Sequence, residues 1–346
     1  MAIANRRIEF HSKQILMAHG AGGEATRQLI EGLFLPAFSN PWLEPLSDAA
    51  TLVAPHGRLA ITSDSFVVRP LRFPGGSIGE LAVNGTLNDL AVSGAKPLAI
   101  TAAFILEAGL PADVLRDEVR AMAAAAERSG VPIVTGDTKV VEHGRADGLY
   151  ISTTGLGVVD SRVDLRPERV EVGDRVLLSG PIGNHGMAIM LARAELEIEA
   201  EIRSDTRPLT NLIAAMIERA AGGIKWMRDA TRGGVATVLN ELARDAQLAV
   251  SIEEEAIPVD DMVRGACELL GLDPLQVANE GQFLAVVAED AADAALEALR
   301  GVPGGERACL LGEITDGRLA RVVARSAYGG TRVVDMLIGD PLPRIC

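Results

Sequence analysis

The chain has 346 residues, of which 48% are hydrophobic and 3% aromatic, and its formal net charge is −14. This length allows two domains of ordinary size, and the composition indicates a folded core rather than disorder. The negative charge argues against nucleic-acid backbones and anionic membranes as partners, so an enzyme of this kind that handles phosphates would need Mg²⁺ or local donors.

The first residues contain two arginines with no apolar run behind them, so we expect no signal peptide. The longest apolar windows, such as 98–106, are too short to span a bilayer. The three cysteines, Cys267, Cys309 and Cys346, form no CxxC pair and indicate neither a disulfide framework nor a zinc site. These features together predict a protein of the reducing cytoplasm.

Strands and helices are predicted to alternate through the first half of the chain. Residues 13–34 are expected to form a short strand, a glycine turn (HGAGG) and a helix, and 40–48 a proline-rich connection. The strands predicted after this are 59–68, 97–106, 131–141 and 149–159, and the helices are 77–94 and 112–129.

A polar break at 161–174 precedes the second half, which repeats the alternation. Its predicted strands are 175–178, 248–254, 283–289 and 318–324, and its predicted helices are 187–196, 210–221, 235–245 and 290–300. The last stretch loses this rhythm. We therefore divide the chain into an N-terminal segment (1–48), two α/β domains (49–160 and 161–325) and a C-terminal tail (326–346).

The sequence offers only weak evidence for a dinucleotide site. No GxxxxGK[ST] motif is present, whereas Gly20, Gly22 and Ala25 form a G-x-G-x-x-A pattern between the predicted strand and helix. The following segment FSNPWLEPL is not the second strand that a Rossmann unit needs. NAD or FAD binding is therefore disfavoured.

Several acidic residues are predicted at strand ends or in glycine-flanked loops, where open α/β sheets place ligands. Carboxylate oxygens at such positions suit Mg²⁺, although a single carboxylate there is usually solvated or caps a helix. The residues are Asp64 after the strand 59–63, Asn88 and Asp89 in the helix 77–94, Asp137 at the end of 131–136, and Asp229 before TRGG.

Other candidates have an ordinary structural explanation as well as a chemical one. Lys139 could reach a phosphate or be a surface lysine, and His19 and His185 could assist catalysis or be structural. Glu280, in ANEGQ, could be a solvated loop acid. Partly buried there, it would have a raised pKa and could act as a general base.

Together these motifs resemble the HypE family of hydrogenase maturation factors, within the AIR synthetase-like (PurM-like) ATP-binding superfamily. The resemblance covers essentially the whole chain and is most specific at the terminal PRIC. The segments that carry it are HGAGG (19–23), TSDSFVV (62–68), GELAVNGTLNDLAVSGAKP (79–97), TGDTKVV (135–141), SGPIGNHGMAI (179–189), RDATRGGVATVLNE (228–241), NEGQ (279–282) and PRIC (343–346).

The resemblance implies a two-domain AIR synthetase-like fold with a mobile C-terminal tail and a homodimer with ATP sites at or near its interface. It implies that a carbamoyltransferase, HypF, loads a carbamoyl group onto Cys346. ATP then phosphorylates the carbamoyl oxygen, and loss of phosphate leaves a thiocyanate. The cyano group then passes to iron on a HypC–HypD scaffold.

The resemblance also implies roles for individual residues. Asp64, Asp89, Asp137 and Asp229 are similar to the Mg²⁺–ATP acids of the family. Lys139 would neutralise phosphate charge or orient the carbamoyl group, Glu280 would take the N–H proton, and a histidine such as His19 stays open as the base. The other residues expected at the nucleotide are Gly20, Gly22, Gly23, Asn88, Gly136, Thr231 and Arg232.

The tail from Gly330 to Cys346 could span about 50 Å when extended, which allows a loading and a dehydration position. Pro341 and Pro343 would stiffen its last segment, and we expect the tail to switch positions as ATP binds. Two alternatives remain. One is a superfamily ligase or kinase with a diffusible small substrate, for which Cys346 is incidental. The other is a non-enzymatic cyano-group scaffold.

Overall fold

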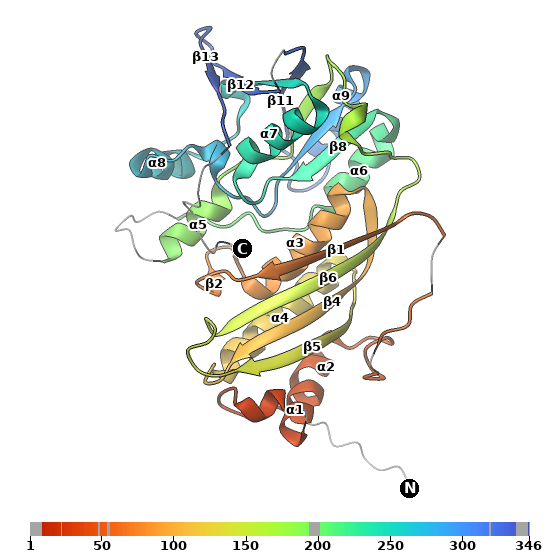
Figure 1. Cartoon of the computed structure of the whole chain (residues 1–346), viewed down its shortest axis with the longest axis vertical. Coiled ribbons are helices and arrows are strands. Elements are labelled where there is room, and N and C mark those ends of the chain that lie inside the picture. Colours follow the sequence, from red (N-terminus) through yellow and green to blue (C-terminus); the bar gives the residue numbers. More distant parts are fainter. Residues whose placement is uncertain are drawn as a thin grey trace.

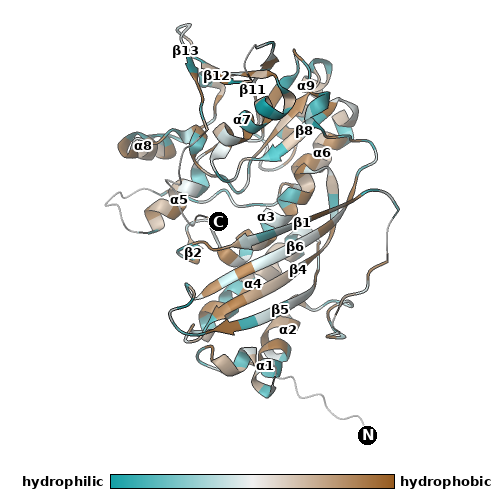
Figure 2. Ribbon diagram, viewed as in Figure 1, coloured by the Kyte–Doolittle hydropathy of each residue, from teal (hydrophilic) through white to brown (hydrophobic). Residues whose placement is uncertain are grey.

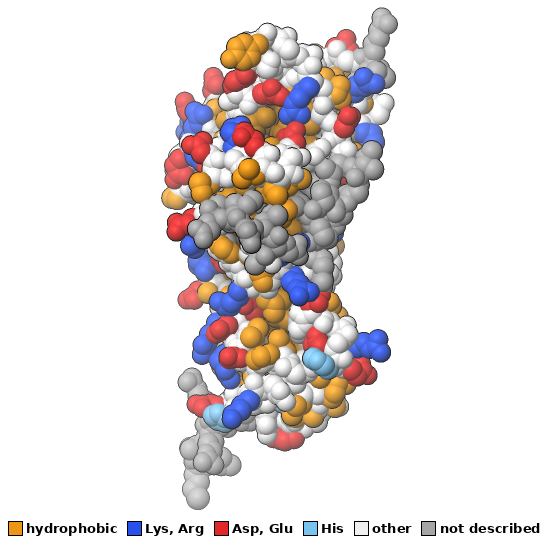
Figure 3. Space-filling view, turned by 90° about the vertical axis from the view of Figure 1, so that its left-hand side faces the viewer, with side chains coloured by type: hydrophobic (Ala, Val, Ile, Leu, Met, Phe, Trp, Pro, Cys, Tyr) orange, Lys and Arg blue, Asp and Glu red, His pale blue; other side chains and the backbone are white. Residues whose placement is uncertain are grey.

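The computed structural model describes residues 9–21, 23–47, 49–53, 56–193, 201–317, 320–336 and 345. The molecule is elongated, and each half contains its own β-sheet with helices packed on it (Figure 1). Both halves mix helices with strands, in agreement with the two α/β domains expected from the sequence. Acidic and basic side chains are interspersed over the face shown in Figure 3. No helix in the described ranges is long and apolar enough to cross a membrane.

The first sheet has the strand order β1-β6-β4-β5, in which only β4 and β5 are parallel. Its strands are β1 (Leu59–Phe66), β6 (Leu149–Val159), β4 (Ala95–Glu107) and β5 (Ile133–Val141). Buried and partly exposed residues alternate along β6, and hydrophobic and hydrophilic residues share each strand of this sheet (Figure 2). This period of two indicates that one face is covered and the other is not.

Two helices, α3 (Ile78–Val92) and α4 (Ala112–Ser129), cover the inner face of this sheet. The limits of α4 agree with the predicted 112–129. α3 is buried almost all round because the sheet lies on one side and the second half of the chain on the other. The opposite, outer face carries Leu59, Ile61 and Ile105, which are 54%, 74% and 42% exposed.

The prediction of a strand at the start of 13–34 is wrong. Gln14 makes only an isolated bridge to Pro111, and the chain then forms the 3₁₀ helix η1 (Met17–Gly20). The N–H of Leu16 donates to Nδ1 of His19 at 2.9 Å, so a side chain within the turn takes the place of a strand partner. The expected helix follows as α1 (Glu24–Leu29), the π-helix η2 (Ile30–Phe34) and α2 (Leu35–Phe38).

The second sheet has the order β13-β12-β9-β11-β7-β10-β8, and only β12 and β9 are parallel. Helices pack on both of its faces: α6 and α9 contact one side of β10, and α5 and α7 share a core with the other. The strands are β7 (Arg175–Leu178), β8 (Ile224–Asp229), β9 (Ala249–Glu253), β10 (Phe283–Val287), β11 (Cys309–Thr315), β12 (Val322–Arg325) and β13 (Thr331–Val333). The helices are α5 (Asn184–Ala192), α6 (Thr210–Ala220), α7 (Gly234–Ala246), α8 (Asp261–Leu270) and α9 (Ala292–Arg300).

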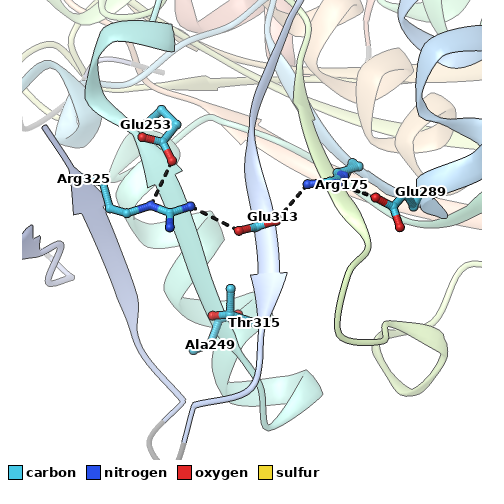
Figure 4. A network of polar contacts seen from close by, with 7 residues as sticks. All are labelled: Arg175, Ala249, Glu253, Glu289, Glu313, Thr315 and Arg325. Atoms are coloured by element: carbon cyan, nitrogen blue, oxygen red, sulfur yellow. Dashed lines mark hydrogen bonds and ion pairs between the residues drawn. The ribbon is translucent and has the colours of Figure 1, made fainter. Parts of the chain in front are cut away.

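A row of acidic and basic side chains runs across four neighbouring strands of this sheet and joins them by ion pairs (Figure 4). Arg325 on β12 donates to Glu253 on β9 at 2.9 Å and to Glu313 on β11 at 3.1 Å. Arg175 on β7 donates to Glu313 at 2.8 Å and also pairs with Glu289. A slip of one residue in any of these strands would turn its charge to the other face, so the ion pairs reinforce the register.

Several elements had no counterpart in the sequence-based prediction. They are β8, whose residues from Trp226 on were expected to form a loop, β11, α8 and the short hairpin of β2 (Arg72–Phe73) and β3 (Gly76–Ser77). In addition, β13 lies inside the segment 326–346 that was expected to be tail, since it pairs with β12.

Candidate active site

Four acidic side chains from distant parts of the sequence line one pocket between the two halves of the molecule. Asp64 comes from β1, Asp89 from α3, Asp229 from the last position of β8, and Glu280 from the loop before β10. The pocket has a volume of about 240 Å³. Its other lining residues are Ser65, Phe66, Gly85, Thr231 and Arg232.

Asp64 does not follow a strand, as the sequence suggested, but lies within β1. The antiparallel pairing of β1 with β6 continues through Asp64, which is opposite Thr153, to Phe66. The side chain of Asp64 therefore faces α3, where Thr86 donates to its carboxyl at 3.4 Å. The sheet, rather than a loop, holds this acid beside Asp89.

The carboxyl groups of Asp64 and Asp89 face the same pocket, and Thr62 donates to Asp89 at 2.7 Å. Burial, together with the charge of Asp89, raises the pKa of Asp64 to about 6. Two neighbouring carboxylates repel each other when both are ionised, and this repulsion adds to the effect of burial on Asp64. A cation placed between them would remove that repulsion.

Burial and the nearby Asp89 raise the pKa of Asp229 to about 7. Burial, followed by the charges of Asp229 and Asp205, raises the pKa of Glu280 well above its ordinary value. Glu280 is therefore a buried acid and not a solvated loop acid, and its role as a base stays a prediction. The positive charge of Arg232 acts in the opposite sense on Asp64 and Glu280.

The backbone of the NEGQ loop is fixed by a residue that the sequence analysis did not single out. The two carboxyl oxygens of Asp205 accept from the N–H groups of Glu280 and Gly281, each at 3.1 Å. A Cβ on Gly281 would lie 1.9 Å from the carbonyl oxygen of Asp205, so only glycine allows this approach. Positions 205 and 280 are far apart in sequence, and no spacing rule could have connected them.

Asn88 is in the predicted helix, but it does not line the pocket. Its amide nitrogen donates to the carbonyls of Arg207 at 3.0 Å and Glu280 at 3.2 Å, and its amide oxygen accepts from the N–H of Leu209 at 2.8 Å. Asn88 therefore connects α3 to the second half of the chain, and one of its bonds holds the backbone of Glu280, the most buried acid of the pocket.

Asp137 and Lys139 lie apart from these four acids. Asp137 was expected at a strand end but lies inside β5, three strands from β1 in the first sheet. The register places Asp64, Thr153, Ala102 and Gly136 in one row across the sheet, so Asp137, one position on, points to the outer face. Lys139 Nζ is 3.0 Å from Asp137 Oδ1, and this contact lowers the pKa of Asp137.

The residues of the HGAGG motif lie beside β5 rather than at the pocket. A Cβ on Gly20 would be 2.7 Å from the backbone nitrogen of Val140, which shows how closely the turn approaches this strand. His19 is buried and contacts the ring of Phe10 edge-on at 5.3 Å, and Gly23 precedes α1. Gly136 is exposed on β5. Gly22 and Cys346 lie outside the described residues.

The expected site residues therefore form two groups within one chain. The pocket holds Asp64, Asp89, Asp229, Thr231, Arg232 and Glu280. The β5 group consists of His19, Gly20, Gly136, Asp137 and Lys139. The pocket residues Ser65, Phe66 and Gly85 were missed, although TSDSFVV and AVNGTLND surround the acids that were found.

The donor set of the pocket fits Mg²⁺. Its carboxylate oxygens are hard ligands. Burial, and after it the charge of Asp89, raises the pKa of Asp64 and of Asp229, and a divalent cation in the pocket would stabilise their ionised forms. No three His, Cys, Asp or Glu side chains in the described ranges are arranged around a single metal position. This agrees with a cation that takes one or two protein carboxylates and completes its shell with phosphate oxygens and water.

Comparisons with known proteins give the family. The models of "AIR synthase related protein, N-terminal domain" and "AIR synthase related protein, C-terminal domain" match residues 46–159 and 171–325. "Carbamoyl dehydratase HypE" of Bradyrhizobium diazoefficiens is 49% identical over 346 residues, which cover 100% of both chains.

Two solved structures extend the comparison. The crystal structure of the hydrogenase maturation protein HypE in complex with ATP has a TM-score of 0.91 and 43% identity, and the match covers 96% of this chain and 99% of that one. The HypE chain of a HypE–HypF complex has a TM-score of 0.79 and 45% identity, with 89% and 99% covered. The chain belongs to the HypE family of AIR synthase related proteins.

Proposed function

We propose that this protein is an ATP-dependent carbamoyl dehydratase that acts on a thiocarbamate carried by its own Cys346. The overall change converts Cys346–S–C(=O)–NH₂ and ATP into Cys346–S–C≡N, ADP and phosphate. The observation that carries the proposal is the pocket in which the buried Glu280 lies beside Asp64, Asp89 and Asp229. The relatives named carbamoyl dehydratase and the HypE structure with ATP support it.

The chemistry needs ATP because an amide oxygen is a poor leaving group and phosphate is a good one. The carbamoyl oxygen attacks the γ-phosphorus, ADP leaves, and the nitrogen loses one proton. The carbon–oxygen bond then breaks, phosphate takes the oxygen with it, and the nitrogen loses its second proton. The protein contributes mainly positioning and charge neutralisation to such a transfer.

One or two of the carboxylates of Asp64, Asp89 and Asp229 would hold Mg²⁺, which would neutralise phosphate charge when bound. Arg232, in the same pocket, adds a fixed positive charge on the chain itself. Thr231, directly before it, offers a hydroxyl at the pocket wall. These groups explain how a chain of net charge −14 can accept a polyanion at one point of its surface.

Glu280 is the group we assign to proton removal from the carbamoyl nitrogen. It is 4% exposed, and its backbone is held by Asp205, so the carboxyl is both desolvated and fixed in place. A base with a raised pKa takes up a proton more readily than an ordinary carboxylate. It has to be ionised before the reaction, and a bound cation beside it favours that form.

Lys139 would act from a second copy of the chain. The outer face of the first sheet carries Lys139 together with three large, exposed apolar side chains, Leu59, Ile61 and Ile105. Such a face favours pairing with another copy. In a homodimer formed through it, the β5 group of one subunit would complete the pocket of the other.

We further propose that the carbamoyl group is loaded by HypF and that the cyano group passes to iron on a HypC–HypD scaffold as a ligand for NiFe hydrogenase. The solved HypE–HypF complex supports the first of these contacts.

The proposal is tested by the intact mass of the C-terminal peptide after incubation with the carbamoyl donor system and ATP. We expect a carbamoyl adduct on Cys346 that loses the mass of one water only when ATP is present. The matched control is Cys346→Ser, which should carry no such product. If this variant still hydrolyses ATP in step with formation of a diffusible product, the protein is instead a small-substrate member of the superfamily.

A further inference from the structure

A buried histidine outside the pocket holds the last peptide group of the chain. His185 is the second residue of α5 (Asn184–Ala192) and is 0% exposed. Its ring packs edge-on against Phe73, with ring centroids 5.6 Å apart. Its Nδ1 lies 2.8 Å from Oγ of Ser204, and its Nε2 lies 2.7 Å from the carbonyl oxygen of Ile345. Ile345 is bonded directly to Cys346.

The proton positions follow from the partners. A carbonyl oxygen can only accept, so Nε2 of His185 carries the hydrogen and donates it to Ile345. Oγ of Ser204 accepts from the N–H of Thr206 at 3.1 Å, which leaves the serine hydroxyl free to donate to Nδ1. Every polar atom of the set is satisfied with a neutral ring, and burial lowers the pKa of His185 in agreement with this.

The docked end is also fixed by packing. The Ile345 side chain is 5% exposed and belongs to the main hydrophobic cluster of the molecule. The ring that holds its carbonyl is oriented by Ser204, whose N–H donates to the carbonyl of Pro74 at 2.8 Å. Ile345 is thus held in two ways: its side chain is packed in the hydrophobic cluster, and its carbonyl accepts from His185.

The docking site is continuous with the catalytic loop. Ser204, which orients the histidine, is followed directly by Asp205, whose carboxylate holds the N–H groups of Glu280 and Gly281. The same short segment therefore supports both the ring that binds Ile345 and the backbone of the proposed base. A mutation that moves this segment would shift the two together.

We propose that His185 is a positioning residue that docks the C-terminal end by donating a hydrogen bond to the carbonyl of Ile345, so that Cys346 is delivered beside the Glu280 loop. This role rests on the proposed function, since it concerns the delivery of the modified cysteine. His185 acts through the backbone of the chain and need not touch the reacting atoms.

Carboxypeptidase digestion tests the docking directly, because the bond that releases Cys346 is the peptide group whose carbonyl His185 holds. We expect His185→Phe, which keeps a ring but cannot donate, to release Cys346 about 5- to 100-fold faster than the parent, the range for a lost buried hydrogen bond. His185→Gln, whose amide can donate from a similar position, should stay near the parent rate. His56→Phe, at an exposed histidine, is the matched control.

Dehydration of the carbamoylated chain is the second readout. In His185→Phe the rate of ATP-dependent water loss should fall by a similar factor while the affinity for ATP stays unchanged, and His185→Gln should restore much of the rate. If His185→Phe does not fold, Ser204→Ala, which removes the orienting hydroxyl and with it the partner of the Thr206 N–H, is used for the digestion comparison. Release of Cys346 at the parent rate from a folded His185→Phe or Ser204→Ala protein overturns the proposal.

The two readouts separate this inference from the proposed function. If the parent protein never loses water from a carbamoyl adduct, the proposed function fails, whereas the digestion rates still report whether His185 docks the chain end. If water is lost normally in His185→Phe while digestion is faster, docking occurs but does not serve delivery, and the proposal is overturned.

Discussion

Asp205 and Glu280 are joined through the backbone: both carboxyl oxygens of Asp205 are used, one on the N–H of Glu280 and one on the N–H of Gly281. The proposed base is therefore positioned by an acid that precedes it by 75 residues. The loop owes its shape to this contact, because a carboxylate that accepts two N–H groups fixes both peptide planes at once.

Asp205→Asn should distort this loop. An amide can accept one of the two N–H groups but turns a donor toward the other, which leaves a buried N–H unsatisfied. We expect the free energy of unfolding to fall by about 1–3 kcal/mol, measured by urea denaturation, and dehydration to slow. Asp293→Asn, at an exposed acid on α9, is the control and should change neither. Equal stability in the two variants would contradict the role of Asp205.

Glu280→Gln should remove the base while keeping the shape of the side chain. We expect the rate of water loss from the carbamoyl adduct to fall by about 10²- to 10⁴-fold, the usual contribution of a general base. ATP binding, measured by calorimetry, should persist because the Asp64, Asp89 and Asp229 set is intact. A variant that dehydrates at the parent rate would assign proton removal to another group.

The acids of the pocket should make the cation-free protein less stable as the pH rises. Folding raises the pKa of Asp229 from its ordinary 3.8 to about 7, so the folded state holds a proton that the unfolded state has lost. The stability from this proton is present below pH 3.8 and is lost as the pH rises to about 7. In EDTA, the free energy of unfolding measured by urea denaturation should fall between about pH 5 and pH 8, by an amount on the order of 2–4 kcal/mol.

Two companion measurements check the cause of that pH dependence. Asp229→Asn should flatten it, because the amide does not titrate. Mg²⁺ should raise the midpoint more at pH 8 than at pH 5, since the cation and the protons compete for the same carboxylates. A slope that survives in Asp229→Asn and is insensitive to Mg²⁺ would place its origin elsewhere.

Mixing two inactive variants tests whether the site is shared between subunits. Lys139→Ala lacks the lysine and Glu280→Gln lacks the base. In a mixed dimer with a shared site, one pocket combines an intact Glu280 with an intact Lys139 from the other chain. We expect activity to recover to about a quarter of the parent value after subunit exchange at equal amounts, given random pairing of symmetric subunits.

Recovery is expected only for this arrangement. If Lys139 and Glu280 act within one chain, every pocket in the mixture lacks one of them and no activity returns. A mixture of Glu280→Gln with Glu280→Ala is the control, because it cannot form an intact pocket under either arrangement.

Asn88→Ala should weaken the contact between the two halves of the chain. The substitution leaves two carbonyls and one N–H without their buried partner. We expect a loss of about 1–3 kcal/mol in the free energy of unfolding, measured by urea denaturation. Asn211→Ala, at an exposed asparagine on α6, should be close to neutral. A neutral Asn88→Ala would show that these bonds are replaced by water.

Sequence periodicity predicted the helices that have a single buried face and the strands that are buried throughout. α4 has one buried face and ends before Gly130, and β10 is a continuous apolar run. The short strand predicted at the start of 13–34 is wrong because the chain forms a turn there, in which the N–H of Leu16 donates to His19 and not to a neighbouring strand. β11 was overlooked because its buried and partly exposed positions do not alternate regularly, owing to a bulge between Leu310 and Gly312.

The acids of the pocket could be found from glycine-rich and acidic motifs, but their arrangement could not. The sequence gives no indication that Asp137 faces the opposite side of the sheet from Asp64, because that depends on the pairing of β1, β6, β4 and β5. The roles of Asp205 and His185 depend on contacts over long sequence separations. Their residue types alone are compatible with ordinary loop positions.

The bonds of Asn88 limit how the protein can move. A hinge motion that opened the two halves would break three hydrogen bonds of the buried Asn88 side chain, among them the one to the carbonyl of Glu280. These bonds oppose such an opening, so the proposed reaction has to proceed with the two halves held in the arrangement described above.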